Sequence, residues 1–141
     1  MNIIIFTNIE MEKKIITTAA LLGMIAIILG AFGAHALKKV LSFEELTTFE
    51  TAVKYQMYHA LFLLFVSLSP IADKIKNRIF YLVLSGIIMF SGSIYLLATR
   101  NITNIDFGFI GIVTPIGGLL LILGWAVLLF YFLKNKSQKT N

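Results

Sequence analysis

The sequence contains no cysteine, only two prolines and few charged residues. The lack of cysteine excludes disulfide frameworks, thiol catalysis, and zinc or iron–sulfur sites with cysteine ligands. Asp, Glu, Lys and Arg make up 13% of the 141 residues, whereas a soluble domain carries roughly 25%. This shortage of charge excludes an ordinary soluble globule, and the length leaves room for one domain.

Long apolar runs take the place of the missing charge. The four runs are Ile15–Leu37, Tyr55–Ile71, Ile79–Ala98 and Phe109–Leu133. A bilayer core of roughly 30 Å requires about 20 apolar residues of helix, and the second run falls slightly short of that length. The sequence therefore predicts an all-α polytopic membrane protein with four transmembrane helices in a bundle.

This interpretation divides the chain into three parts. Residues 1–12 form an N-terminal extension, 13–133 the four-helix transmembrane domain, and 134–141 a polar cytoplasmic tail. Either Met1 or Met11 could be the true start. A signal peptide cleaved near Ala34–Ala36 is an alternative for the first run, but the run is longer than the usual apolar region of such a peptide, which favours a retained helix.

The basic residues predict how these helices are oriented. With four spans, the N-terminus, the second loop and the C-terminus share one side of the membrane and carry eight Lys and Arg residues. The other side carries Lys38, Lys39, Lys54 and Arg100. The positive-inside rule then places both termini in the cytoplasm. Because the cations flank apolar runs, the net charge of +5 indicates lipid head groups rather than nucleic acid as partners.

Small residues in the first and fourth runs predict close helix packing. Glycine and alanine allow neighbouring helix backbones to approach each other in a membrane. The candidate packing residues are Gly23, Gly30, Ala34, Gly117 and Gly118. Pro115 lies inside the fourth run and predicts a kink there, because proline removes a backbone donor and clashes with the preceding turn.

The segment between the first two runs predicts a short amphipathic helix. Ser42 and Glu45 have the spacing of a capping box, so a helix should begin near Phe43. Apolar residues then recur on one side, which suits a helix in the outer membrane interface. This helix could continue into the second span.

Two histidines are the candidate metal ligands. His35 ends the first run and His59 lies near the start of the second, so an antiparallel pair should place both near the outer interface. Two imidazoles can bind a metal or haem iron. Two ligands alone do not make a closed zinc site, so ordinary interfacial polar residues are the preferred interpretation. Glu50 or Asp106 could supply a third ligand, and no cofactor is assigned.

Aromatic and polar residues gather around His59. Tyr55, Gln56 and Tyr58 could recognise a quinone or a lipid head group, but an aromatic belt at the membrane boundary explains them as well. Trp125 is expected near the cytoplasmic end of the fourth span. Spans three and four carry no ionisable residue in their interiors, which argues against a proton pump or ion-coupled transporter.

Several segments together resemble one known family. They are Gly30–Leu37, Phe49–Val53, Tyr55–Ala60, Ser91–Tyr95, Thr114–Gly118 and Gly124–Trp125. They are similar to the domain-of-unknown-function 423 family of small membrane proteins, which is related to human transmembrane protein 256. The resemblance covers most of Met11–Leu133. It implies a four-helix bundle in the bacterial plasma membrane, and it implies no activity or catalytic residue.

Three functions compete at this point. The first is a non-enzymatic integral membrane protein, serving as an accessory or assembly partner. The second is a small oligomeric channel or carrier whose kinked fourth helix lines the path. The third is a metal- or haem-binding protein that uses His35 and His59. The expected partners are membrane lipids, together with further copies of the chain or other membrane proteins.

Overall fold

The computed structural model describes residues 2–103 and 108–135, and the side chains of residues 10–103 and 109–134. Within these residues the structure is helical and has no strand. The elements are α1 (Asn2–His35), η1 (Leu37–Lys39), α2 (Phe43–Leu68), α3 (Asp73–Ala98), α4 (Arg100–Thr103), η2 (Gly108–Ile112) and α5 (Val113–Asn135). The predicted all-α class is therefore confirmed.

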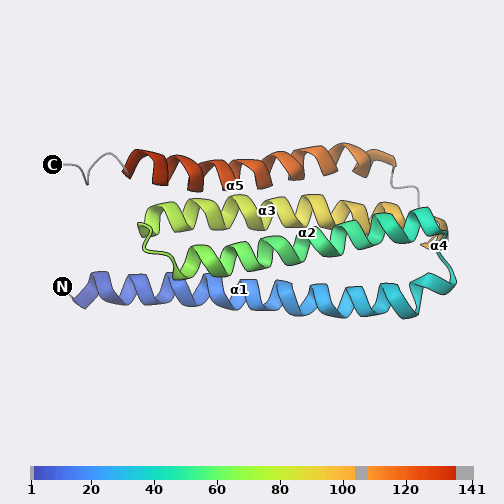
Figure 1. The fold of residues 1–141 in the computed structure, drawn as a ribbon, viewed down its shortest axis with the longest axis horizontal. Helices are drawn as coiled ribbons and strands as arrows, with labels where there is room; N and C mark the ends of the chain where they lie inside the picture. Colours follow the sequence, from blue (N-terminus) through green and yellow to red (C-terminus); the bar gives the residue numbers. More distant parts are fainter. Residues whose placement is uncertain (1, 104–107, 136–141) are drawn as a thin grey trace.

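The four long helices lie side by side in an antiparallel bundle (Figure 1). Helix α1 packs on α2, α2 on α3, and α3 on α5. Helix α2 thus lies between α1 and α3 (Figure 1). The start of α1 and the end of α5 lie at one end of the bundle, together with the turn between α2 and α3 (Figure 1). We call this the termini end, and the opposite end the loop end.

Two clusters of buried side chains hold the bundle together. The larger cluster joins all four long helices and includes Ile15, Leu63, Phe80, Val83 and Leu121. The smaller cluster lies toward the loop end. It combines Leu37, Leu41, Phe49 and Ala98. Apolar burial against neighbouring helices therefore continues along the bundle, as dispersion-driven packing requires.

Helix α2 begins with the capping box that the sequence predicted. The Ser42 hydroxyl accepts a hydrogen bond from the Glu45 backbone N–H, and the Glu45 carboxylate accepts one from the Ser42 N–H at 2.8 Å. The helix then continues without a break to Leu68, and Pro70 follows its end. The predicted helix start near Phe43 and its continuation into the second run are therefore confirmed, whereas a separate short helix is not an element of its own in the described part of the chain.

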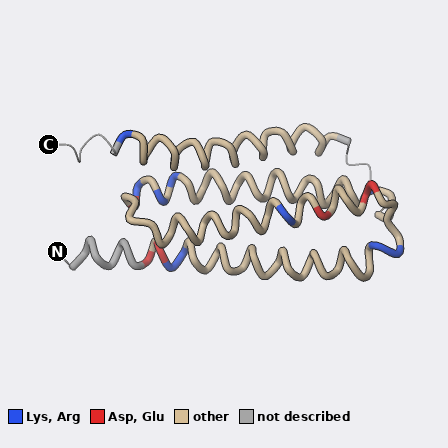
Figure 2. The backbone as a smooth tube through the Cα atoms, viewed as in Figure 1, with Lys and Arg blue, Asp and Glu red and all other residues tan. Residues whose placement is uncertain are grey.

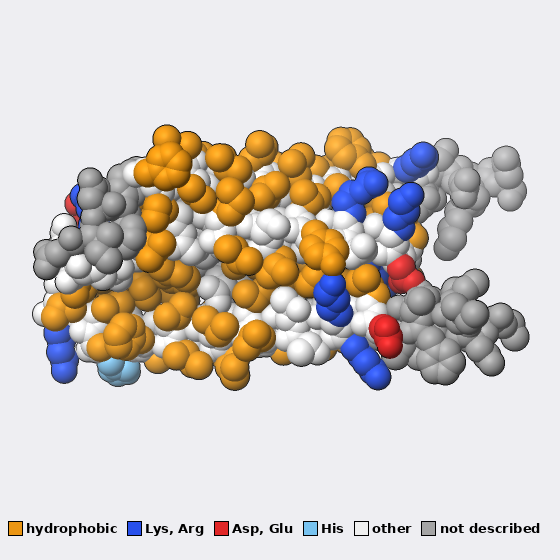
Figure 3. All heavy atoms as spheres, turned by 180° about the vertical axis from the view of Figure 1, so that it is seen from behind, with side chains coloured by type: hydrophobic (Ala, Val, Ile, Leu, Met, Phe, Trp, Pro, Cys, Tyr) orange, Lys and Arg blue, Asp and Glu red, His pale blue; other side chains and the backbone are white. Residues whose placement is uncertain are grey.

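Three helical segments are long and apolar enough to cross a membrane within the residues that the structure describes. They are Glu10–Lys39, Asp73–Ala98 and Phe109–Lys134. Helix α2 is not among them, and it carries charged residues in its first half and polar residues such as Gln56 and His59 near its middle. Charged residues gather toward the two ends of the bundle (Figure 2). Apolar side chains cover the middle of the face seen in Figure 3.

The fourth predicted span differs from expectation at its start. Pro115 is the third residue of α5, where the first-turn N–H groups have no helical partner, so proline is tolerated there. Pro115 thus lies at the start of α5, directly after η2, and not in the interior of one continuous helix as the kink prediction assumed. Residues 136–141 of the predicted tail lie outside the described residues, whereas Lys134 belongs to α5.

Candidate functional site

His59 is buried in the middle of the bundle and binds two partners. It lies about 24 Å along α2 from Phe43, at 1.5 Å per residue, and is 6% exposed. Its Nδ1 lies 2.8 Å from the backbone carbonyl oxygen of Tyr55. The Trp125 indole N–H on α5 donates to His59 Nε2 at 3.3 Å. Trp125 is thus near the middle of α5, and its expected position near the cytoplasmic end is wrong.

These partners determine which ring nitrogen of His59 carries the proton. A backbone carbonyl only accepts hydrogen bonds, and an indole N–H only donates them. Nδ1 must therefore be the donor to Tyr55, and Nε2 must be the acceptor from Trp125. The neutral ring satisfies both contacts, which removes the cost of a charge inside the bundle.

Aromatic rings surround His59 on the side of a lateral cavity. The cavity of about 460 Å³ lies between α2, α3 and α5. Its lining residues are Tyr55, His59, Phe90, Gly118, Leu121, Ile122 and Trp125. The Tyr55 and Phe90 ring centroids are 4.9 Å apart, and Phe62 stacks on Trp125 at 4.0 Å. We call this the aromatic cavity.

The structure does not bring the two histidines together. His35 is exposed at the end of α1, next to Gly33, which faces Phe49 of α2. His59 lies ten residues, or about 15 Å of helix, beyond Phe49. The expectation of equal depth and a shared polar cluster is therefore wrong, because the two helices pair in a register that separates the rings.

Among residues 10–103 and 109–134, no third metal ligand joins either histidine. In the described part of the chain, no three side chains of His, Asp or Glu are close enough to hold a metal ion. Glu50 instead pairs with Lys54 at 3.7 Å, and Asp106 lies outside the described residues. Both ring nitrogens of His59 already have partners. This geometry gives the metal and haem hypothesis no support.

A second polar contact links three helices, one turn of α2 before His59. The Gln56 amide donates to the backbone carbonyl of Leu22 in α1 at 2.8 Å. The Tyr95 hydroxyl in α3 donates to the Gln56 side-chain oxygen at 3.0 Å. Both ends of the buried amide are thereby paired, which fixes α2 between its two neighbours.

A buried lysine near the termini end was missed by the sequence interpretation, which placed it in a loop. Lys76 lies in the first turn of α3 and is 3% exposed. Its ammonium group contacts the Glu12 carboxylate at 2.8 Å and donates to the Ser67 carbonyl oxygen at 2.7 Å. Helical spacing could have revealed this burial from the sequence. Lys76 lies on the same helix face as Ile79, Phe80 and Val83, which are all buried.

Glycines make the tightest contacts between α3 and α5. A Cβ atom on Gly117 would collide with the Phe90 backbone nitrogen and lie 2.8 Å from the Phe90 Cα. Cβ atoms on Gly86 and Gly124 would lie 2.6 Å from Leu121 and Val83 side chains. A Cβ atom on Gly118 would lie 3.5 Å from the Phe90 ring, which is an ordinary van der Waals contact. The sequence interpretation did not single out Gly86 and Gly124 as packing residues. Their need to lack a side chain becomes visible only when the structure places Leu121 and Val83 against them.

The candidate packing residues of α1 have different environments. A Cβ on Gly30 would make ordinary contact with Val53 at 3.4 Å, and one on Gly23 would lie 3.9 Å from the Met57 sulfur. Ala34 is exposed and does not serve the contact with α2.

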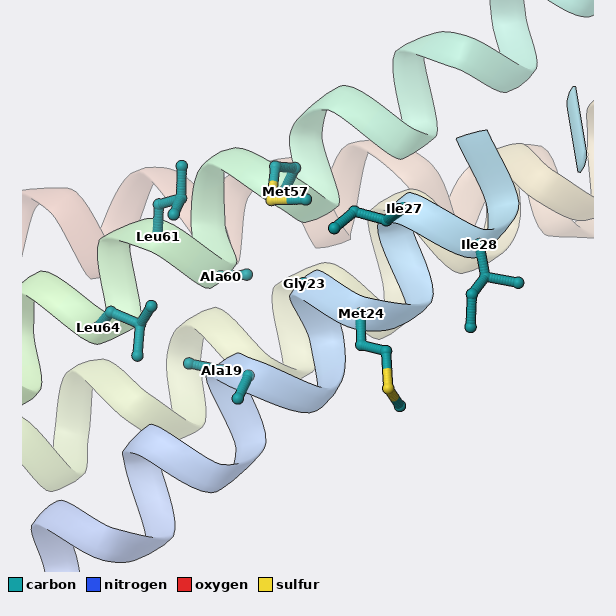
Figure 4. Close-up of a pocket in the computed structure, with 10 residues that line it drawn as sticks. Ala19, Gly23, Met24, Ile27, Ile28, Met57, Ala60, Leu61 and Leu64 are labelled. Carbon is teal, nitrogen blue, oxygen red and sulfur yellow. The ribbon is translucent and has the colours of Figure 1, made fainter. Parts of the chain in front are cut away.

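An apolar groove runs along the outside of the α1–α2 pair (Figure 4). It measures about 420 Å³. Ala19, Gly23 and Ala60 form its small-residue part, and Met24 and Leu61 are among the larger side chains beside it (Figure 4). We call this the lateral groove.

Comparison with known proteins reveals relatives along most of the chain. Residues 29–118 match the family described as "Protein of unknown function (DUF423)". A UPF0382 membrane protein of Staphylococcus saprophyticus is 44% identical over 117 residues, which cover 82% of this chain and 93% of that protein. No solved structure matches the chain.

Two Gram-negative relatives have similar coverage. A UPF0382 membrane protein of Haemophilus influenzae is 39% identical over 131 residues, covering 90% of this chain and 99% of that protein. The UPF0382 inner membrane protein YgdD of Escherichia coli is 36% identical over 127 residues, covering 85% of this chain and 89% of that protein. These matches confirm the resemblance derived from the sequence segments.

Proposed function

Because the chain belongs to the DUF423 family of membrane proteins of unknown function, we propose that it is a four-span accessory protein of the bacterial plasma membrane. In this proposal both termini are cytoplasmic, and the protein has no enzymatic activity. It assembles laterally with another membrane protein, which contributes an apolar transmembrane helix.

The position of α2 supports four membrane crossings. Helix α2 packs between α1 and α3, and both neighbours contain segments long and apolar enough to span. Its charged residues lie in its first half, and the helix from Tyr55 onward is apolar apart from a few polar residues. Four antiparallel crossings return the C-terminus to the side of the N-terminus, and the basic residues of that end favour the cytoplasm.

The lateral groove is the observation that supports a helical partner. Exposed apolar side chains such as Met24 and Leu61 line it, and helix interfaces in a membrane gain energy from dispersion packing of such side chains. The groove is almost entirely apolar, as a lipid-embedded helix requires. Met24 and Ile27 are 53% and 66% exposed, so this side of α1 is available in the single chain.

Site-specific photocrosslinking in living cells tests this proposal. A photoreactive amino acid replaces Met24 in the lateral groove or, as a matched control, Leu129 on α5, which is 57% exposed. We expect a discrete adduct with one membrane protein from position 24 and none from position 129. Gly23→Leu should abolish the adduct, because its side chain would obstruct the groove.

The other outcomes contradict the assembly role. If position 24 forms adducts only with lipid, then lipid and not a protein helix occupies the groove. An adduct of twice the chain mass would identify a second copy instead of another protein. An adduct that persists with equal yield in the Gly23→Leu variant would not depend on the groove.

The channel or carrier alternative gains no specific support. Pro115, on which its kinked fourth helix depended, lies in the first turn of α5, and the large buried cluster fills the contacts between the four helices.

A further inference from the structure

We propose that the aromatic cavity is a binding site for a lipid-soluble quinone or quinol ring, which enters sideways from the membrane. This site is distinct from the lateral groove, because the cavity lies between α2, α3 and α5 and the groove lies between α1 and α2.

The walls of the cavity suit a flat ring. At about 460 Å³ it is within the range of ligand pockets, which is roughly 300–1,000 Å³. Tyr55 and Phe90 supply aromatic faces from α2 and α3. Phe62 covers one side of the Trp125 indole, yet 51% of Trp125 remains exposed. Offset stacking on such rings gives specificity beyond simple apolar burial.

The polar pair in the wall matches the groups of a quinone. The Trp125 N–H can donate to a quinone carbonyl, and His59 Nε2 can accept from a quinol hydroxyl. Their mutual contact is long, at 3.3 Å, so it is a weak bond that a ligand can replace. The second bond of His59, to Tyr55, keeps its ring in the same tautomer during this exchange.

This pair also argues against a lipid acyl chain as the occupant. Burying polar groups in a membrane is costly, and intramembrane ionisable residues commonly mark functional sites. An acyl chain would occupy only the apolar walls and would leave the indole N–H and the imidazole paired with each other, so it makes no use of the polar pair. A quinone ring uses the apolar walls and both polar atoms, and its isoprenoid tail can remain in the bilayer.

Trp125 is the single tryptophan of the chain and reports directly on the cavity. We would reconstitute the full chain in phosphatidylcholine–phosphatidylglycerol vesicles and titrate menadione, a naphthoquinone, while recording fluorescence intensity and lifetime. Bound quinone quenches statically, so intensity should fall to a plateau while the lifetime stays constant. Collisions in the lipid phase shorten the lifetime and do not saturate.

Two matched leucine substitutions locate the site. Gly118→Leu adds a side chain to the cavity lining, whereas a Cβ on Gly92 in α3 meets no atom within 4 Å. We expect Gly118→Leu to raise the half-saturating menadione concentration by about tenfold or more, because it removes ring contacts, and Gly92→Leu to leave it unchanged. Ile122→Ala, at a 65% exposed lining position, removes an apolar wall of the cavity and should also raise the half-saturating menadione concentration. This variant locates the site if Gly118→Leu fails to fold.

Two results would overturn the proposal. One is purely collisional quenching, equal in the wild type and both leucine variants. The other is saturable quenching by phosphatidylcholine with brominated acyl chains that depends on Gly118 but does not compete with menadione, which would assign the cavity to a lipid chain. His59→Leu should also weaken menadione binding, since it removes a polar partner while keeping the cavity apolar.

Discussion

Buried polar side chains connect the helices at the scale of single residues. Gln56, His59 and Lys76 are each at least 94% buried, and each has two hydrogen-bond partners on other residues. The buried Ser91 hydroxyl, by contrast, has no hydrogen-bond partner among the residues that the structure describes. In a membrane interior a lost partner cannot be replaced by water, so these contacts specify which helices pair.

Removing the Lys76 charge should destabilise the termini end. Lys76→Met leaves the Ser67 carbonyl and the Glu12 carboxylate without their ammonium partner. Because Glu12 is partly exposed, we expect a loss of about 1–2 kcal/mol in the free energy of unfolding. Thermal unfolding in detergent, followed by circular dichroism, measures it. Lys74→Met is the exposed control, and equal melting temperatures for both variants would contradict the structural role of Lys76.

Adding one methyl group to Gly117 should disturb the α3–α5 contact. The new Cβ would collide with the Phe90 backbone, which cannot move as a side-chain tip can. We expect Gly117→Ala to cost about 1–3 kcal/mol, as overpacking usually does. Gly92→Ala is the control, since its Cβ meets open space and alanine favours helix. If Gly117→Ala were as stable as Gly92→Ala, α3 and α5 would be able to move apart without cost, which would contradict the tight contact.

The start of α2 depends on local chemistry at the scale of the element. The capping box joins Ser42 and Glu45, and Asn101 beyond α3 donates a further hydrogen bond to the Glu45 carboxylate. This carboxylate therefore orders the helix start and ties α2 to the segment that follows α3.

The stability of this helix start should depend on pH. Hydrogen bonds from the Ser42 backbone N–H, then from the Ser42 hydroxyl and Asn101, lower the pKa of Glu45. The charged form is favoured in the folded state, so its contribution is present above the ordinary carboxyl pKa of about 4.3. It is lost as the pH falls through the lower folded value.

Variants at two neighbouring glutamates test this dependence. Glu45→Gln keeps a capping side chain but removes the titration, so the acid-dependent loss of melting temperature between about pH 5 and 3 should shrink. Glu44→Gln replaces an exposed glutamate outside the capping box and keeps Glu45, so the variant should retain the pH profile of the wild type. Identical pH profiles for both variants would contradict the role of Glu45. Ser42→Ala should cost about 1 kcal/mol at neutral pH.

The order of helices decides the topology at the scale of the whole molecule. Four crossings place the start of α1, the α2–α3 turn and the end of α5 on one side of the membrane. Three crossings without α2 would place the start of α1 on one side, and the α2–α3 turn and the end of α5 on the other. Alkaline phosphatase fused after Leu133, after Pro70 or after Lys39 distinguishes these cases, because the enzyme is active only outside the cytoplasm.

We expect phosphatase activity only for the fusion after Lys39. The residues before Pro70 and the end of α5 lie at the termini end, and η1 lies at the loop end (Figure 1). Activity after both Pro70 and Leu133 would show that α2 does not cross. Green fluorescent protein fused at the same positions provides the complementary control, because it fluoresces only in the cytoplasm and also reports that each fusion is expressed.

The sequence by itself determined the class of the protein and several local features. Apolar run length specifies helices, since every backbone polar group in lipid must be paired within the helix. The spacing of Ser42 and Glu45 predicted the start of α2, because a capping box involves residues only three apart. The family also followed from short segments of sequence.

Only the tertiary structure decided which residues meet. His59 and Trp125 are 66 positions apart, and Lys76 and Glu12 are 64 apart. Likewise, the need for glycine at positions 86 and 124 becomes visible only when Leu121 and Val83 lie against them. These contacts depend on the lateral order and the axial register of the helices. Apolar periodicity leaves both open, because any apolar face can bury itself against another, whereas backbone clearance and buried polar pairs select one arrangement.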